Sequence, residues 1–120
     1  MDKFSVQSEV KAIPGDIKEN AIVVTASGRI DSETAPAFDA ELAKAVEINS
    51  RMVINLKGVN YMSSAGLRSI TKAWQTAEKA GGAVRLAGVS ESISSVMYTV
   101  GLNQKMASFA SVDEAIASFG

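Results

Sequence analysis

Stretches with the hydrophobic period of a strand alternate with stretches that have the period of a helix, and this alternation constrains the fold more than any other feature of the chain. Short runs of apolar, often β-branched residues, typical of buried strands, occupy residues 21–25, 51–56 and 83–87. Each run is followed by apolar residues three and four positions apart, the spacing of a helix with one buried face. Alternating strands and helices indicate an α/β fold with right-handed crossovers.

One further strand is predicted at the N-terminus, where it would pair with the strand that contains residues 21–25. Residues 4–13 alternate loosely between polar and apolar, and Pro14-Gly15-Asp16 favours a turn before the run at residues 21–25. Gly28-Arg29-Ile30-Asp31 would end the second strand, and the first is expected in an antiparallel or edge position. Because no linker, repeat or low-complexity segment interrupts the chain, we expect a single domain over residues 1–120, with a mixed sheet of four to five strands and about four helices.

Two helices are predicted in the first two thirds of the chain. The first covers roughly residues 33–47, with Pro36 in its opening turn, where a missing N–H costs little. The second follows Ser63-Ser64 and ends at Gly81-Gly82. Residues 57–60, before the second helix, are predicted to form a loop.

Two more helices are predicted near the C-terminus. The third is capped by Ser90 and stops at Gly101, and the fourth begins at the capping box from Ser111 to Glu114, after a short extended piece near residues 106–109. Apolar stripes are expected to turn all four helices toward the core. The stripe residues are Phe38, Leu42, Ala45, Val46; Leu67, Ile70, Trp74, Ala77; Ile93, Val96, Met97, Val100; and Val112, Ala115, Ile116, Phe119.

The composition excludes several classes of function. Neither histidine nor cysteine occurs among the 120 residues, which removes the commonest general base, the commonest metal ligand and all thiol chemistry. The sequence has no Walker A or Gly-x-Gly-x-x-Gly pattern, and Met62 occupies the first glycine position of a nucleophile elbow. We therefore expect no catalytic residue, no cofactor and no bound metal, and we do not expect an enzyme.

Charge and hydropathy narrow the choice of partners. Twelve basic and thirteen acidic residues give a net charge of −1 without any block of like charges, so binding to nucleic acid is not expected. No apolar run approaches the ~20 residues that cross a bilayer. These patterns predict a cytoplasmic protein without direct membrane insertion.

The strand-to-helix junction around Ser63-Ser64 is the best candidate site. A serine at a helix N-terminus can accept hydrogen bonds from the free N–H groups of the first turn, and the same groups attract anions. The serine pair is therefore either an ordinary cap or a place where a phosphate would be tolerated. Asp31 also follows a strand, at the sheet edge where functional groups gather, and it is equally a candidate cap for the first helix. Arg68 and Lys72 form a solvated face or meet an acidic partner.

The order of elements, together with three sequence motifs, resembles the STAS domain of bacterial anti-sigma-factor antagonists over nearly the whole chain. The motifs are Gly28-Arg29-Ile30-Asp31, residues 53–67 with Tyr61-Met62-Ser63-Ser64-Ala65-Gly66-Leu67, and Val100-Gly101-Leu102 leading to residues 111–115. The resemblance implies that Ser64, two positions before the Gly-Leu pair, is the phosphoacceptor. Ser63 stands where the family commonly has Asp, and Ala65 where a second small hydroxyl residue is common.

The same resemblance implies a partner-switching function. The unphosphorylated protein would bind an anti-sigma factor with serine kinase activity and so release the sigma factor. Phosphorylation of Ser64 would end binding, and a metal-dependent serine phosphatase would restore it. The implied contacts with the partner are Asp31, Ser63, Gly66, Arg68 and Lys72. Two alternatives are an accessory STAS subunit of a membrane complex, such as a lipid-transport ATPase, that binds without phosphorylation, and a nucleotide-binding STAS domain, for which no glycine-rich phosphate loop exists.

Overall fold

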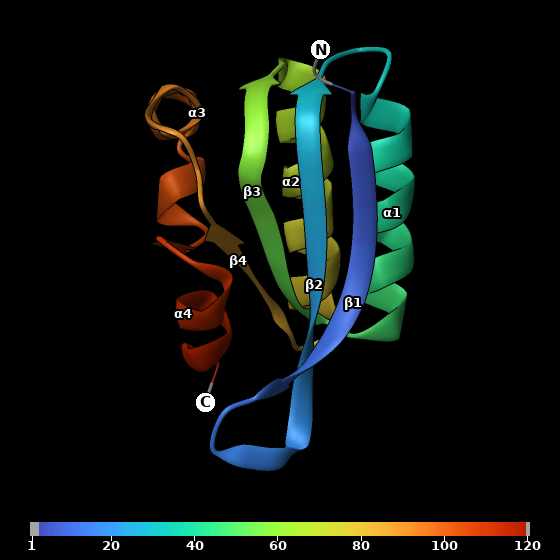
Figure 1. Ribbon diagram of the computed structural model, residues 1–120, viewed down its shortest axis with the longest axis vertical. Helices are drawn as coiled ribbons and strands as arrows, with labels where there is room; N and C mark the ends of the chain where they lie inside the picture. Colours follow the sequence, from blue (N-terminus) through green and yellow to red (C-terminus); the bar gives the residue numbers. More distant parts are fainter. Residues whose placement is uncertain (1–2, 120) are drawn as a thin grey trace.

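Five strands form one sheet in the order β1-β2-β3-β4-β5 in the computed structural model, which describes residues 3–119 except the side chains of residues 16–18. β1 pairs antiparallel with β2, and all the other neighbours are parallel (Figure 1). The mixed sheet and the antiparallel edge position of its first strand are thus confirmed. The strands are β1 (Ser5–Ile13), β2 (Asp16–Ile30), β3 (Arg51–Met62), β4 (Ala83–Ala87) and β5 (Ser108–Phe109).

The predicted helices are all present. α1 and α2 lie side by side behind the sheet, whereas α4 packs beside β4 (Figure 1). Pro36 lies in the first turn of α1, as expected. No helix within residues 3–119 has the length and apolarity needed to cross a membrane. The helical elements are α1 (Ala35–Ile48), α2 (Ser64–Lys79), α3 (Glu91–Thr99), the short 3₁₀ turn η1 (Leu102–Gln104) and α4 (Val112–Ala117).

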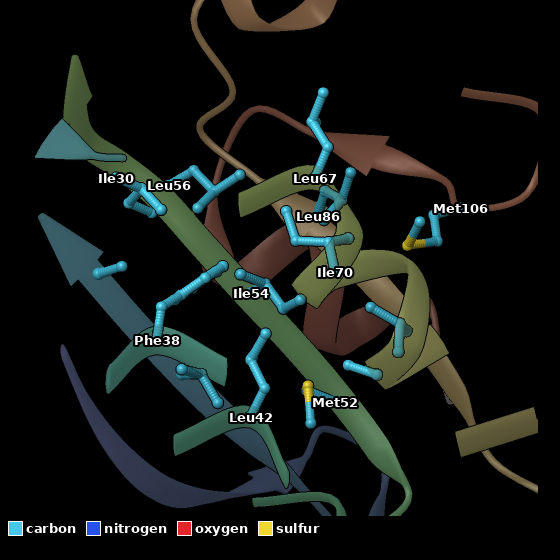
Figure 2. Close-up of a cluster of buried hydrophobic side chains, with 14 of the residues drawn as sticks. Ile30, Phe38, Leu42, Met52, Ile54, Leu56, Leu67, Ile70, Leu86 and Met106 are labelled. Carbon is cyan, nitrogen blue, oxygen red and sulfur yellow. The ribbon is translucent and has the colours of Figure 1, made fainter. Parts of the chain in front are cut away.

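The main core lies between the sheet and the α1–α2 layer. Alternate residues of β3, such as Met52, Ile54 and Leu56, point to this side and meet Phe38 of α1 and Ile70 of α2 (Figure 2). The intervening strand residues face the other way and form a smaller cluster that α4 closes. Each fully buried large side chain contributes about 1.5–3 kcal/mol, so both faces of the central strands stabilise the sheet.

β3 is longer than the sequence predicts. The expected loop at residues 57–60 is strand, and Gly58 and Val59 pair with Ser27 and Gly28 of β2. Lys, Gly and Asn are poor strand formers, but β2 itself extends to Ile30 and supplies hydrogen-bond partners. The pairing is irregular here, and a Cβ on Gly58 would lie 2.8 Å from the Ser27 Cβ. Glycine therefore permits the close approach of the two strands rather than ending one of them.

The predicted apolar stripe of α3 is only half buried. Ile93 and Met97 enter the main core, whereas Val96 and Val100 are 43% and 56% exposed. The helix spans nine residues and presents one ridge, i and i+4, to the core. The neighbouring ridge therefore faces outward, together with the exposed Tyr98.

Candidate functional site

The ends of β2 and β3 are joined where α2 begins. The register pairs Arg29 with Tyr61 and Ile30 with Met62. One residue later, the Ser63 N–H donates a hydrogen bond of 2.8 Å to the Ile30 carbonyl. The loop that starts at Asp31 and the serine pair thus leave the sheet at the same edge, where the tips of both strands lie (Figure 1).

The two serines differ in position and exposure. Ser63 is the N-cap of α2, with an extended backbone, but its side chain accepts no capping hydrogen bond. Its Oγ is shielded from solvent and has no hydrogen-bond partner within the described part of the chain. Ser64 is the first residue of α2 and is exposed. Of the two hydroxyls, that of Ser64 is therefore the accessible one.

The N-terminus of α2 favours a negative charge. The first N–H groups of a helix have no acceptor within it, and the Ser63 side chain supplies none here. The first turn of α2 contains no acidic residue. Arg68 is exposed and lies four residues after Ser64, on the same side of the helix. An anion on Ser64 would therefore meet the partial positive charge of the helix end and a nearby guanidinium.

Asp31 holds the turn that leads into α1. Its Oδ1 accepts hydrogen bonds from the N–H groups of Glu33, at 3.0 Å, and Thr34, at 3.2 Å, and Arg29 Nε lies 3.2 Å from its Oδ2. The N–H of Thr34, the N–H of Glu33 and the Arg29 side chain, in that order, hold the pKa of Asp31 below its ordinary value. Asp31 is therefore not the N-cap of α1, as one alternative predicts, because that residue is Thr34; the carboxylate instead holds the turn that precedes the helix. The side chain is still 30% exposed, so it also belongs to the surface of the site.

Arg29 and Tyr61 form a part of the site that the sequence interpretation did not include. The guanidinium carbon of Arg29 lies 4.0 Å from the centre of the Tyr61 ring, and Tyr61 is 41% exposed. Arg29 is two residues from Asp31, and this spacing signals a shared face. Tyr61 could not be assigned as its neighbour without the β2–β3 register.

Gly66 allows the first turn of α2 to pack closely beneath the site. It is buried, and a Cβ at this position would lie 2.7 Å from Met62 Cγ and 2.8 Å from Ile30 Cγ2. The absence of a side chain lets the first turn of α2 pack against the ends of both strands. Gly66, predicted as a partner contact, is therefore explained by internal packing and positions Ser64 above it.

Lys72 lies away from the junction. It follows Ser64 by eight residues, which places it about 12 Å farther along the helix axis. Its Nζ is 3.4 Å from Asp39 Oδ2 of α1, at the rim of a groove of about 130 Å³ between α1 and α2. Of the five predicted partner contacts, Asp31, Ser63, Gly66 and Arg68 gather around Ser64, whereas Lys72 joins α2 to α1.

Comparison with known proteins agrees with this architecture. An anti-sigma-B factor antagonist of Bacillus subtilis (strain 168) is 34% identical over 89 residues, covering 72% of this chain and 82% of that protein. An anti-sigma factor antagonist from Mycobacterium paratuberculosis has a similar fold, with a TM-score of 0.77 and 23% identity over 95% of this chain and 93% of the other.

The Bacillus cell fate determinant SpoIIAA in its phosphorylated form is also similar in fold, with a TM-score of 0.71 and 19% identity over 98% of this chain and all of that one. A family model described as the STAS domain matches residues 12–115. Since that match spans most of the sequence, the chain belongs to the STAS domain family.

Proposed function

We propose that this protein is an anti-sigma-factor antagonist that binds an anti-sigma factor at the junction of β2, β3 and α2. The observation that carries the proposal is the exposed Ser64 hydroxyl at the first position of α2, next to a cap that forms no side-chain hydrogen bond. The antagonist from Bacillus subtilis, 34% identical, supports the same class of function. The protein then acts by binding, not by catalysis.

Ser64 is the proposed phosphoacceptor, and the anti-sigma factor the proposed kinase. The kinase site of the anti-sigma factor would transfer the γ-phosphoryl group of ATP to Ser64 Oγ, which forms a new O–P bond and releases ADP. The hydroxyl proton of Ser64 would pass to a base of the kinase. A metal-dependent phosphatase would hydrolyse that bond and return the hydroxyl. Both reactions are catalysed by the partners, and this chain is their substrate.

The charge on a phosphate explains why binding and folding respond differently. Phosphorylation adds about −1.5 to −2 charges at neutral pH. At the start of α2, the partial positive charge of the helix end stabilises the phosphate by on the order of 1 kcal/mol. This offsets part of the free-energy cost of adding the charge, so the domain keeps its fold. At a partner surface a repelled charge costs several kcal/mol, and each ~1.4 kcal/mol is a tenfold change in affinity. The complex should therefore dissociate while the fold persists.

Two substitutions at Ser64 test the proposal. The partner is first recovered by affinity capture from the native host, and its affinity for the purified variants is then measured by calorimetry. S64A should bind like the wild type and resist phosphorylation, whereas S64D should bind at least about a hundredfold more weakly, because a like or unpaired charge costs several kcal/mol. S94D, a matched change of an exposed serine in α3, should bind normally.

Unchanged binding by both Ser64 variants would contradict the switch. Mapping of the phosphopeptide after incubation with the kinase and ATP should find the phosphate on Ser64 and not on the shielded Ser63. Capture of a membrane transport complex, with no phosphate on either serine, would instead support the role of an accessory subunit.

A further inference from the structure

The outer edge of β1 is a long strand edge that pairs with no other strand among residues 3–119. β1 is the terminal strand of the sheet and lies in front of α1 at its border (Figure 1). Its nine residues contain no proline, and its backbone is free to pair on the outer side. Such an edge is a template for an added strand, and the side chains along it determine which strand fits.

The charges of β1 are arranged about Val10. Glu9 and Lys11 pair with Val23 and Ala21 of β2, so both side chains lie on the sheet face opposite α1. Their charged groups are 3.6 Å apart, and the side chains are 67% and 42% exposed. An acid and a base on either side of one residue make the edge complementary to itself in the antiparallel sense.

The other face of the same edge is apolar. Val10 is opposite Ile22, on the α1 side, and is 50% exposed. Ser8 Oγ donates a hydrogen bond to Glu41 of α1, which places these two residues at one level. Val10 lies about 7 Å farther along β1, and Ile48, seven residues after Glu41 on the same side of the helix, about 10 Å farther along α1. The two exposed apolar side chains, Ile48 being 57% exposed, therefore project from the same border.

We infer that two copies of this chain pair antiparallel through β1, about a two-fold axis at Val10 and perpendicular to the sheet. This register sets Glu9 opposite the partner's Lys11, and Lys11 opposite the partner's Glu9, on one face. On the other face the two Val10 side chains meet, flanked by Ile48 of each copy. An axis at Glu9 would instead oppose two glutamates, and an axis at Ser8 would set Glu9 opposite Gln7. Of the axes at Ser8, Glu9 and Val10, only the one at Val10 pairs opposite charges.

The interface is small, so the dimer should be concentration-dependent. Analytical ultracentrifugation of the full chain over a concentration series should show a reversible monomer–dimer equilibrium. E9K and K11E should each weaken self-association by about tenfold or more, because each sets like charges opposite one another. An equimolar mixture of E9K and K11E should form a heterodimer with roughly the affinity of the wild type, since every cross-strand pair is then complementary.

The mixture of E9K and K11E distinguishes the Glu9–Lys11 contact between two copies from the Glu9–Lys11 contact within one chain. Both variants lose their internal Glu9–Lys11 pair, so an effect confined to one chain cannot create a heterodimer. V10D should also abolish the dimer, whereas Y98S, which alters an exposed aromatic residue of α3, should leave it intact. Circular dichroism checks that each variant is folded.

A chain that remains monomeric at every concentration overturns the inference. So does a dimer that Y98S dissociates or that shows no preference for the E9K–K11E mixture, because its interface would lie elsewhere. A monomer that binds a strand of another protein along β1 would have the same edge but a different occupant, and it would overturn the self-pairing as well.

Discussion

Asp31 shows how a single carboxylate organises one side of the site. Two backbone N–H groups and the Arg29 side chain surround it, and Arg29 in turn covers Tyr61. These contacts favour the ionised form. The turn before α1 is therefore stabilised by a charge, and this makes its stability depend on pH.

The direction of that dependence follows from the lowered pKa of Asp31. Its ordinary value is 3.8, and the folded-state pKa lies below it. The contribution is therefore complete at pH values above 3.8 and is lost as the pH falls through the folded-state pKa. The difference in unfolding free energy between wild type and D31N should be constant near neutrality and shrink in acid.

Urea unfolding at a series of pH values measures this difference, with D39N as the control for loss of a carboxylate elsewhere. A difference that grows as the pH falls would contradict the role assigned to the hydrogen bonds of Asp31.

At the scale of residues, the sequence places the site well but describes its interior poorly. The carboxyl ends of neighbouring strands share an edge, so the proximity of Asp31 to the serines follows from the strand pattern alone. The packing that requires Gly66 depends on where Met62 and Ile30 point, and the contact of Arg29 with Tyr61 depends on the strand register. Neither is encoded in local periodicity.

The helix ends differ in how they are capped. Ser90 accepts a hydrogen bond of 3.3 Å from the Ile93 N–H at the start of α3, and Ser111 does the same for Glu114 in α4. Ser63 occupies the equivalent position in α2 but forms no such bond and leaves a shielded hydroxyl without a partner in the described part of the chain. The helix that begins at the proposed phosphorylation site is thus the one of these three without a side-chain cap.

Alanine substitutions should separate the two kinds of cap. S90A should lower the free energy of unfolding by about 1 kcal/mol, because a capping hydrogen bond is lost. S63A should be neutral or stabilising, since it removes a desolvated hydroxyl that has no partner. Both are measured by urea unfolding; a loss in S63A as large as that in S90A would mean that the Ser63 side chain caps α2 in solution.

At the scale of elements, the spacing of apolar residues and the residues typical of helix ends are sufficient to predict the helices. Every predicted helix forms, because apolar spacing and capping residues are local properties. The extension of β3 was missed because a partner strand, not propensity, keeps residues 57–60 extended. The exposure of Val96 and Val100 could not be predicted from the apolar spacing, because burial also depends on how closely the sheet approaches the helix.

At the scale of the whole molecule, the sheet would separate the proposed recognition site from the proposed self-association edge. The proposed switch lies at the tips of β2 and β3, whereas the self-complementary edge is the central part of β1. An axis perpendicular to the sheet reverses the second copy, so the two Ser64 sites of a dimer would lie at opposite ends. Each could then engage its own anti-sigma factor without hindrance from the other.

The same sheet has consequences for the speed of folding. β1 and β2 are joined by a short turn, whereas the strands of each parallel pair are joined by a longer crossover segment that has to fold back across the sheet. Loop closure costs more entropy as the connection grows, so the hairpin is expected to form before the parallel pairs. Gly15 in its turn and Gly81 after α2 both have a positive φ, and a methyl group added to either would meet no neighbouring side chain or strand within 4 Å.

G15A and G81A therefore impose a similar backbone cost, on the order of 1 kcal/mol, at an early and a late point of assembly. In stopped-flow experiments G15A should slow refolding roughly fivefold, whereas G81A should mainly accelerate unfolding. Equal effects of the two variants on the refolding rate would contradict this order. With the hairpin formed first, the antiparallel edge is more than a boundary of the sheet: it is the template on which the remaining strands assemble in time.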